Sequence, residues 1–304
     1  MVLMNIFYCA EYALPSGDET VTKSRRVAEL ITGNPDLGVN LCRPEPVTRA
    51  ELLRIHSANY IDPILTGERT KLPPGDWSPA LLQSLLFSSG GMRDAVQEAL
   101  RSGVSGSLSA GLHHAARSRG WGLCTWNGLA LATLVALEHI EKVGILDTDA
   151  HFGGGTFNIL GANPRVHLCD IGVADLDEWE PTDTSRHHRV HVTHSRRYLG
   201  SVRAALQRLE SVNFLIYDAG MDAHESAGGI PGITTSVIRK REQLVAQWCL
   251  KRRIPVIFSL EGGYTVPLTL TEVAELHMET VRAFAGIARQ LRGDGRVTEG
   301  TSKP

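Results

Sequence analysis

Short apolar segments alternate along this chain with longer, helix-like segments. The short ones are rich in β-branched and aromatic residues, as expected of buried strands: NIFY near residue 5, GVNL near residue 38, VGIL at 143–146, NFLIY at 213–217 and PVIFSL at 255–260. The longer ones are Thr22–Ile31, Thr48–His56, Ser78–Arg101, Leu129–Ile140, Ser236–Lys251 and Thr271–Leu291. Alternation of this kind predicts an α/β fold with a mostly parallel central sheet and helices on both faces.

A single catalytic domain over residues 1–291 accounts for all of these segments. No internal repeat or low-complexity linker divides the chain, and the polar stretch 292–304 is expected to be a frayed C-terminal tail. The segment Asp175–Arg197 is rich in charge, histidine and proline and shows little periodicity. We therefore predict that it is a long surface excursion, where binding loops commonly lie.

Composition and charge narrow the possible partners. The chain has 304 residues, of which 42% are hydrophobic, so it can bury a continuous core. Lys and Arg number 31 against 33 Asp and Glu, and a formal net charge of -2 gives no global basic field for nucleic acid or acidic membrane lipid.

The sequence shows no signal-peptide pattern and no apolar run near the roughly 20 residues of a membrane span. The five cysteines form no Cys-x-x-Cys pair, which fits reduced thiols. We expect a cytoplasmic protein of undetermined oligomeric state.

Polar residues directly follow three of the predicted strands. VGIL leads into Asp147-Thr148-Asp149-Ala150-His151, NFLIY into Asp218-Ala219-Gly220-Met221-Asp222, and PVIFSL into Glu261-Gly262-Gly263-Tyr264. In an open parallel sheet, ligands bind beyond the carboxyl ends of the strands. Two carboxylates and one imidazole suit a zinc-type ion and leave positions open for water and substrate.

The spacing of these residues agrees with one shared ion. Asp149 and His151 are two residues apart, so on an extended strand end their side chains point the same way. Asp222 would complete the set from a neighbouring strand. Taken singly, each piece also has an ordinary structural explanation, since an Asp after a strand often caps a helix and Gly-Gly-Tyr can be a plain turn. Their joint placement after core strands favours the metal site.

Two adjacent histidines, His113 and His114, lie in a glycine-containing loop that precedes an alanine-rich helix. Adjacent histidines are usually surface features. A hydrolytic site, however, needs a proton acceptor for water and a proton donor for a leaving amine, and neutral and charged imidazoles can supply both near pH 7. The pair is therefore a candidate for proton transfer.

Together these motifs resemble the histone deacetylase family, including bacterial members such as acetoin-utilisation-type deacetylases and acetylpolyamine amidohydrolases. The matching stretches, in the family's order, are GLHHA, GLCTWNGLALA, ILDTDAHFGGGT, DAGMDAH and EGGY. Weaker likeness extends through ELLRIHSANYIDPI and the Ser88–Gly91 helix start, so the resemblance covers residues from about 5 to 290. It implies the three-layer α/β/α arginase/deacetylase fold.

The resemblance also implies residue roles. Asp149, His151 and Asp222 match the ligands of a single Zn²⁺, and Tyr264 matches the residue that hydrogen-bonds the substrate carbonyl. The implied activity is hydrolysis of an N-acyl amine, such as an acyl-lysine, an acylpolyamine or a metabolite. Tyr264 would stabilise the oxyanion.

The remaining matches concern proton transfer and the channel. His113 and His114 fall on the paired catalytic histidines, and Asp147 falls on the carboxylate that orients His113. Gly122 and Leu123 fall on the loop that lines the substrate channel. The resemblance further places Asp170 at a position that, with Asp147, can bind K⁺.

The sequence departs from the family at several positions. The partner of the second histidine normally stands five residues after the first metal-binding Asp, where this chain has Gly154. His114 is therefore expected to lack its orienting group, and catalysis to be weaker. Leu123 replaces an aromatic of the channel wall, which predicts a wider pocket. Four histidines lie between His187 and His194, but their spacing fits no usual tetrahedral site, and a solvated loop is favoured.

Two other functions stay open. A ureohydrolase-like enzyme with two metal ions shares this architecture, but that class needs a further Asp two residues after the metal-binding His, where Gly153 stands. A weakly active or inactive member could act as a binding protein, and Gly154 is the one feature that favours it. Restored activity in Gly154→Asp would indicate a tuned-down enzyme.

Overall fold

Parallel strands form the central sheet of the protein. The structure, a computed structural model, describes residues 3–13 and 19–293. Within them the main sheet has the order β2-β1-β5-β10-β9-β6-β7-β8, and all neighbouring strands are parallel. The strands are β1 Met4–Phe7, β2 Val39–Cys42, β5 Val104–Ser107, β6 Val143–Asp147, β7 Val166–Gly172, β8 His187–His191, β9 Phe214–Asp218 and β10 Val256–Ser259. Two short strands, β3 Lys71–Leu72 and β4 Gly75–Asp76, pair separately and antiparallel.

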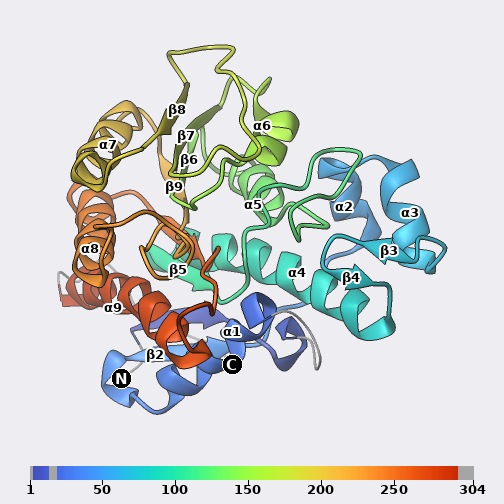
Figure 1. Cartoon of the computed structure of the whole chain (residues 1–304), viewed down its shortest axis with the longest axis horizontal. Coiled ribbons are helices and arrows are strands. Elements are labelled where there is room, and N and C mark those ends of the chain that lie inside the picture. Colours follow the sequence, from blue (N-terminus) through green and yellow to red (C-terminus); the bar gives the residue numbers. More distant parts are fainter. Residues whose placement is uncertain (1–2, 14–18, 294–304) are drawn as a thin grey trace, which may run out of the picture.

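Helices cover both faces of the sheet (Figure 1). One face packs against α1 Glu19–Thr32, α7 Ser195–Arg208, α8 Thr235–Arg252 and α9 Leu270–Gly293. The other packs against α2 Arg49–Ile55, α3 Ala58–Thr66, α4 Pro79–Ser102, α5 Gly128–Ala136 and α6 Gly154–Leu160. Short 3₁₀ helices, η1 Ala10–Tyr12 and η2 Pro35–Leu37, flank the first strands. The predicted three-layer α/β/α fold with a parallel sheet is confirmed.

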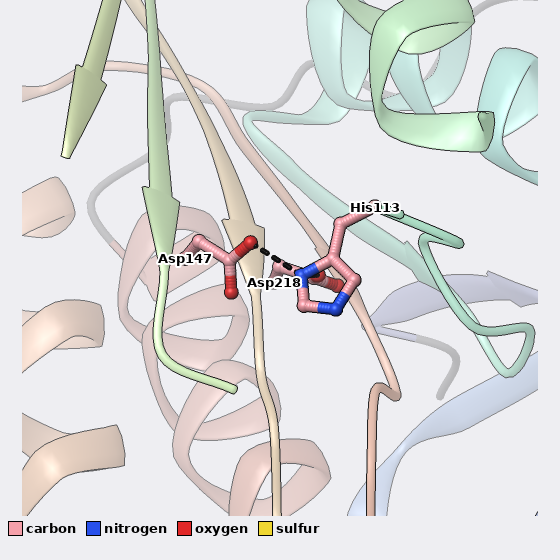
Figure 2. Close-up of side chains that lie close together, drawn as sticks. All are labelled: His113, Asp147 and Asp218. Carbon is pink, nitrogen blue, oxygen red and sulfur yellow. Dashed lines mark hydrogen bonds and ion pairs between the residues drawn. The ribbon is translucent and has the colours of Figure 1, made fainter. Parts of the chain in front are cut away.

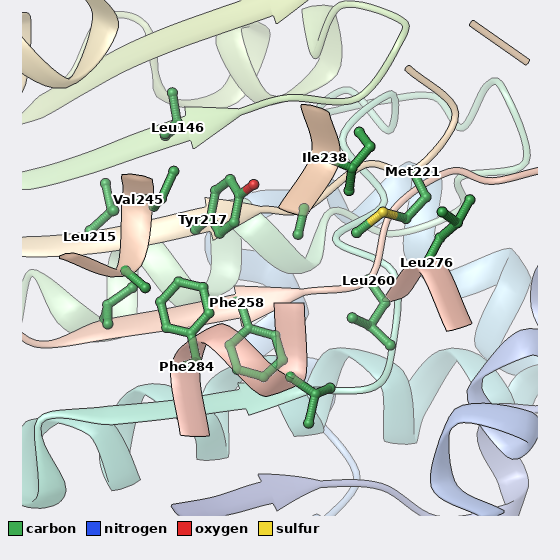
Figure 3. Packing of buried hydrophobic residues seen from close by; sticks show 14 of the residues in the cluster. Leu146, Leu215, Tyr217, Met221, Ile238, Val245, Phe258, Leu260, Leu276 and Phe284 are labelled. Carbon is green, nitrogen blue, oxygen red and sulfur yellow. The ribbon is translucent and has the colours of Figure 1, made fainter. Parts of the chain in front are cut away.

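Alternating side chains of the central strands supply both cores. In β9, Leu215 and Tyr217 join the cluster beneath α8 and α9, whereas Phe214 and Ile216 join the cluster on the opposite face. Because successive residues of a strand point to opposite faces, a strand covered on both sides is apolar throughout. Figure 3 shows the first cluster. This packing fixes the ends of β6, β9 and β10 side by side.

Phe258 lies at the centre of that cluster (Figure 3). Its side chain is fully buried, and its ring centroid is 5.1 Å from that of Phe284. Phe258→Ala should lower the free energy of unfolding by about 3–5 kcal/mol, because it removes buried apolar surface and leaves a cavity. Urea denaturation would measure this. Val266→Ala, at a side chain that is 85% exposed, is the matched control and should change stability by less than about 0.5 kcal/mol. A similar loss in both variants would contradict the packing described.

Several elements were not predicted from the sequence, namely strands β3, β4, β5, β7 and β8 and helices α3, α6 and α7. β5 was not predicted, because its sequence VSGS lacks an apolar signal; its small residues are needed where Gly106 meets the Phe258 ring, 2.5 Å from where a Cβ would lie. The segment Asp175–Arg197 is not wholly a surface excursion, since it contains edge strand β8 and the start of α7. β8 carries polar side chains, as edge strands often do, which hides the strand pattern.

The C-terminal helix ends slightly beyond the predicted domain boundary. α9 extends to Gly293, two residues beyond the predicted domain boundary at 291, and residues 294–304 of the predicted tail lie outside the described residues. Among the helices of residues 3–13 and 19–293, none combines the length and the apolar character required to cross a bilayer.

Candidate active site

The three predicted metal ligands converge at the carboxyl edge of the sheet. The Nδ1 atom of His151 is 3.1 Å from Oδ1 of Asp149 and 3.1 Å from Oδ2 of Asp222. The backbone amide of Ala150 donates to the other oxygen of Asp222, at 2.8 Å. Asp149 and Asp222 are buried, whereas His151 is partly exposed. The side chains form a cluster with one open side.

The electrostatics of this cluster favour a bound cation. Burial and the neighbouring Asp222 raise the pKa of Asp149 to about 7. Burial opposes the charge on His151, but the two carboxylates overcome it and raise the pKa of His151 to about 10. Oδ2 of Asp222 is buried and lies in contact with the protonated Nδ1 of His151. A divalent ion would replace the bound proton and satisfy this oxygen.

The loop after β10 approaches these ligands closely. Gly262 has a φ of 55°, and a Cβ at this position would lie 2.4 Å from Cγ of Asp222 and 2.5 Å from an oxygen of Asp149. Only glycine fits here. The buried ammonium of Lys23, from α1, donates a hydrogen bond to the Gly262 carbonyl. This arrangement holds the loop that carries Tyr264.

Tyr264 faces the cluster across the open side. Its ring centroid is 6.5 Å from that of His151, and both residues line one pocket with His113 and His114. Burial and the nearby carboxylates raise the pKa of Tyr264, so the phenol keeps its proton. It can therefore donate a hydrogen bond to a ligand in the pocket.

His113 is held by carboxylates from two strands. Its Nδ1 lies 2.8 Å from Oδ2 of Asp147, at the end of β6, and 3.9 Å from Oδ2 of Asp218, at the end of β9 (Figure 2). Burial opposes protonation, yet these anions raise the pKa of His113 well above its usual value. The group is close enough to share a metal ion. The hydrogen bond to Asp147 occupies Nδ1 of His113, however, so we interpret these carboxylates as orienting groups.

His114 has a carboxylate partner that the sequence did not predict. Its Nδ1 lies 2.9 Å from Oδ2 of Asp177, a residue of the β7–β8 loop 63 positions away in the sequence. The expectation that His114 lacks an orienting group is therefore wrong. Burial and the charge of His113 lower the pKa of His114 to about 4, which keeps its ring neutral. No local pattern marks Asp177, because only the fold brings the two segments together.

Gly154 permits this contact. A Cβ at Gly154 would lie 2.6 Å from both the backbone oxygen and a carboxylate oxygen of Asp177. Gly154→Asp should therefore lower kcat/KM by about tenfold or more, because it displaces Asp177 without a prepared place for the new carboxylate. Steady-state kinetics with an acyl-lysine amide would measure it. Higher activity in the variant would instead support the original expectation of a missing partner.

The pocket wall includes both residues predicted to line the channel. Gly122 and Leu123 border it together with Pro74 and Leu112. Gly122 and Leu123 have φ values of 52° and 66°, and the glycine packs directly on the His114 ring. Trp121 is 40% exposed and places its ring edge-on to His114, with centroids 5.1 Å apart. Among the described residues, none of the Asp175–Arg197 segment lines this pocket.

Asp170 is buried beside Asp147 in the register of β6 and β7. Oδ2 of Asp170 accepts hydrogen bonds from the Gly153 amide and from Nε1 of Trp179, both at 2.8 Å. Its Oδ1 is buried and has no hydrogen-bond partner. Burial and Asp147 raise the pKa of Asp170 well above its usual value. This oxygen fits the cation position that the sequence suggested.

The histidines between His187 and His194 are spread over an edge strand and the start of the following helix. In the part of the chain that the structure describes, no group of three potential ligands includes any of them. His187 to His191 form strand β8, and His187 packs edge-on against Phe157, with ring centroids 5.1 Å apart. The expectation of a solvated loop is wrong for residues 187–191, which form a strand.

Fold and site together define a three-layer α/β/α protein with an Asp-His-Asp cluster and a histidine pair at the sheet edge. The chain belongs to the histone deacetylase family, since the family described as the histone deacetylase domain matches residues 19–281. This confirms the resemblance seen in the sequence. Membership supports an amide hydrolase.

Individual relatives agree with this assignment. The chain is 29% identical over 244 residues to an uncharacterized protein of Picosynechococcus, a match that covers 73% of this chain and 78% of the relative. It is 27% identical over 248 residues to histone deacetylase 2 of Arabidopsis thaliana, covering 74% of this chain and 63% of the relative. A 50-residue stretch is 48% identical to the acetoin utilization protein AcuC of Staphylococcus aureus, covering 16% of this chain and 13% of that protein.

Solved structures share the fold at low sequence identity. The HD domain of HDA15 has a TM-score of 0.76 at 17% identity, covering 94% of this chain and 90% of its own. An acetylpolyamine aminohydrolase from Burkholderia pseudomallei has a TM-score of 0.77 at 17% identity, covering 93% and 99%. At this identity the likeness establishes the fold alone.

Proposed function

We propose that the protein is a zinc-dependent deacylase that hydrolyses the amide bond of an N-acylated amine. One observation carries this proposal: Asp149, His151 and Asp222 form a ligand cluster that opens onto the same pocket as the histidine pair and Tyr264. A divalent cation fits the cluster because the ligand atoms of two buried carboxylates and one imidazole lie within 4.8 Å of one another.

Asp149, His151 and Asp222 would hold the zinc ion. When bound, zinc supplies Lewis-acid chemistry, polarising the amide carbonyl and acidifying water. The buried Asp170 and Asp147 would hold a K⁺ ion, supported by the unpartnered Oδ1 of Asp170. We propose one zinc ion per chain.

The protein's own groups would handle the protons. His114 is neutral and donates its Nδ1 proton to Asp177, so its Nε2 atom carries a lone pair, which lies 3.1 Å from Nε2 of His113 and would take up the proton of the attacking water when substrate is bound. His114 then passes that proton to the amine as the carbon–nitrogen bond breaks. His113 remains charged, held by Asp147, and places positive charge beside the developing oxyanion. Tyr264 donates a hydrogen bond to the same oxygen.

The amine and acyl group belong to a broad class. Acetylated lysine or polyamine substrates are suggested by the names of the similar proteins, which include histone deacetylases and an acetylpolyamine aminohydrolase. A metabolite amide is a further candidate. Gly122 and Leu123 would contact the linker between amine and carbonyl. A ureohydrolase is disfavoured, since Gly153 stands where that class needs a carboxylate.

A substrate panel tests the proposal. The zinc-loaded protein should hydrolyse at least one member of a set of acetyl-lysine peptides, longer acyl-lysines and acylpolyamines, and a hydroxamate should inhibit it. Elemental analysis should find one zinc ion per chain, whereas a ureohydrolase would carry two metal ions. Binding of these amides without any turnover would favour the binding-protein alternative instead.

A further inference from the structure

We propose that Asp177 is the positioning residue of His114, supplied by the β7–β8 loop in place of the missing group at Gly154. The contact joins a buried group to a partly buried one: the side chain of His114 is 6% exposed and that of Asp177 is 13% exposed, with 2.9 Å between Nδ1 and Oδ2. The same carboxylate oxygen accepts a hydrogen bond from the Gly155 amide at 3.3 Å. The carboxylate is thus fixed from two sides.

The neighbouring acids of this loop point elsewhere. Asp175 pairs with His191 at 2.7 Å, while Glu178 and Glu180 both pair with Arg189, at 2.8 Å and 2.9 Å. The side chains of Asp175, Glu178 and Glu180 are 66%, 46% and 86% exposed. Asp177 differs from all three, because it is turned inward onto a pocket histidine.

The backbone at Asp177 takes an unusual conformation to do so. Its φ is 56°, in the left-handed region that most residues avoid and that Asp tolerates better than branched side chains. Strain of this kind persists only where the surroundings hold it. The Leu176 carbonyl accepts a hydrogen bond from the Phe152 amide at 2.9 Å, and Trp179 stacks on Phe157 with centroids 4.3 Å apart. Both anchors lie beside Asp177.

The contact between Asp177 and His114 determines which nitrogen of His114 carries the proton. A carboxylate can only accept, so the Nδ1 atom of His114 must carry its proton and Nε2 must keep its lone pair. That tautomer is the one that can take a proton from water in the pocket. The loop contact would therefore set which nitrogen of His114 is reactive, as an orienting carboxylate does in a Ser-His-Asp triad. This inference rests on the proposed function where it concerns turnover.

Two readouts on the zinc-loaded full-length protein test the assignment. In Asp177→Asn and Asp177→Ala, kcat for an acetyl-lysine aminocoumarin peptide should fall by roughly 100-fold or more while KM changes less than about threefold. In ¹⁵N-histidine-labelled protein, the Nδ1–H resonance of His114, assigned with His114→Gln, should be present in the wild type and shifted or lost in both variants. Asp175→Asn, in the same loop, is the control and should leave both readouts unchanged.

The outcomes separate the two proposals. An unchanged His114 resonance in folded Asp177 variants would overturn the positioning role, and so would an unchanged kcat. A wild type that turns over none of the amides but loses the resonance in Asp177→Asn would refute the proposed function and retain the contact. Near-UV circular dichroism confirms folding, and Asp177→Glu offers a conservative second variant whose partial recovery of kcat over Asp177→Ala supports orientation by a carboxylate.

Discussion

Asp222→Ala should remove the bound metal and nearly all activity. The substitution deletes one of the three proposed zinc ligands, and Asp149 and His151 alone should not hold a zinc ion firmly. We expect kcat/KM to fall by about three orders of magnitude or more, because the reaction would lose the Lewis-acid contribution of the metal. Elemental analysis after gel filtration should show the zinc content of the variant well below that of the wild type, in parallel with the lost turnover.

The melting temperatures of the metal-free proteins provide a second test of Asp222→Ala. Asp222 is buried, accepts a hydrogen bond from the Ala150 amide at 2.8 Å and pairs with His151 at 3.1 Å, so its removal leaves both groups without a partner. Apo Asp222→Ala should therefore melt below the apo wild type, whereas zinc should raise the melting temperature of the wild type alone. Asp62→Ala, at an exposed ion pair with Arg49, is the control for both measurements. Full zinc content and full activity in Asp222→Ala would refute the ligand assignment.

Tyr264→Phe should slow turnover by about two to three orders of magnitude. The change removes one hydroxyl and leaves the ring, so the pocket wall and the Asp-His-Asp cluster stay in place. Because the hydrogen bond to the carbonyl oxygen strengthens as negative charge develops there, the loss should fall mainly on kcat, with a small effect on KM. Steady-state kinetics with the best amide of the panel would measure both constants.

Zinc content distinguishes this effect from that of a lost ligand. Tyr264→Phe should bind as much zinc as the wild type, and a hydroxamate should still bind to it, only more weakly. Tyr8→Phe is a suitable control, since Tyr8 packs edge-on against Tyr12 and does not line the pocket. If Tyr264→Phe retained wild-type kcat, another group would have to stabilise the oxyanion, and the charged His113 would be the first candidate.

Much of this site could be predicted because its residues sit at the ends of apolar strands. In a parallel sheet all such ends share one edge, so Asp149, Asp222 and Tyr264 are brought together by topology that the sequence pattern already indicates. The resemblance to the family, which is confirmed, was seen in the same stretches, because they follow one another in the family's order. The fold class, the candidate metal ligands and the histidine pair were therefore accessible without coordinates.

The side chains that surround the two histidines and the pocket loop could not be predicted from the sequence. Asp218 was visible as a strand-end carboxylate, but only the register of β6 and β9 places it beside Asp147 and close to His113. Lys23 lies in an amphipathic helix far from every motif, and its burial against the Gly262 carbonyl depends on how α1 packs. Strand β5 carries no apolar pattern at all, because small residues there make room for Phe258.

The sequence by itself determined the α/β class and the Asp-His-Asp set, because strand periodicity and strand-end residues are local properties of the chain. The tertiary structure alone decided how His114 is held. An absent side chain at Gly154 looked like a defect in the sequence, yet in three dimensions it is the space that Asp177 fills. Contacts between loops depend on the path of the backbone between them, and no local pattern encodes that path.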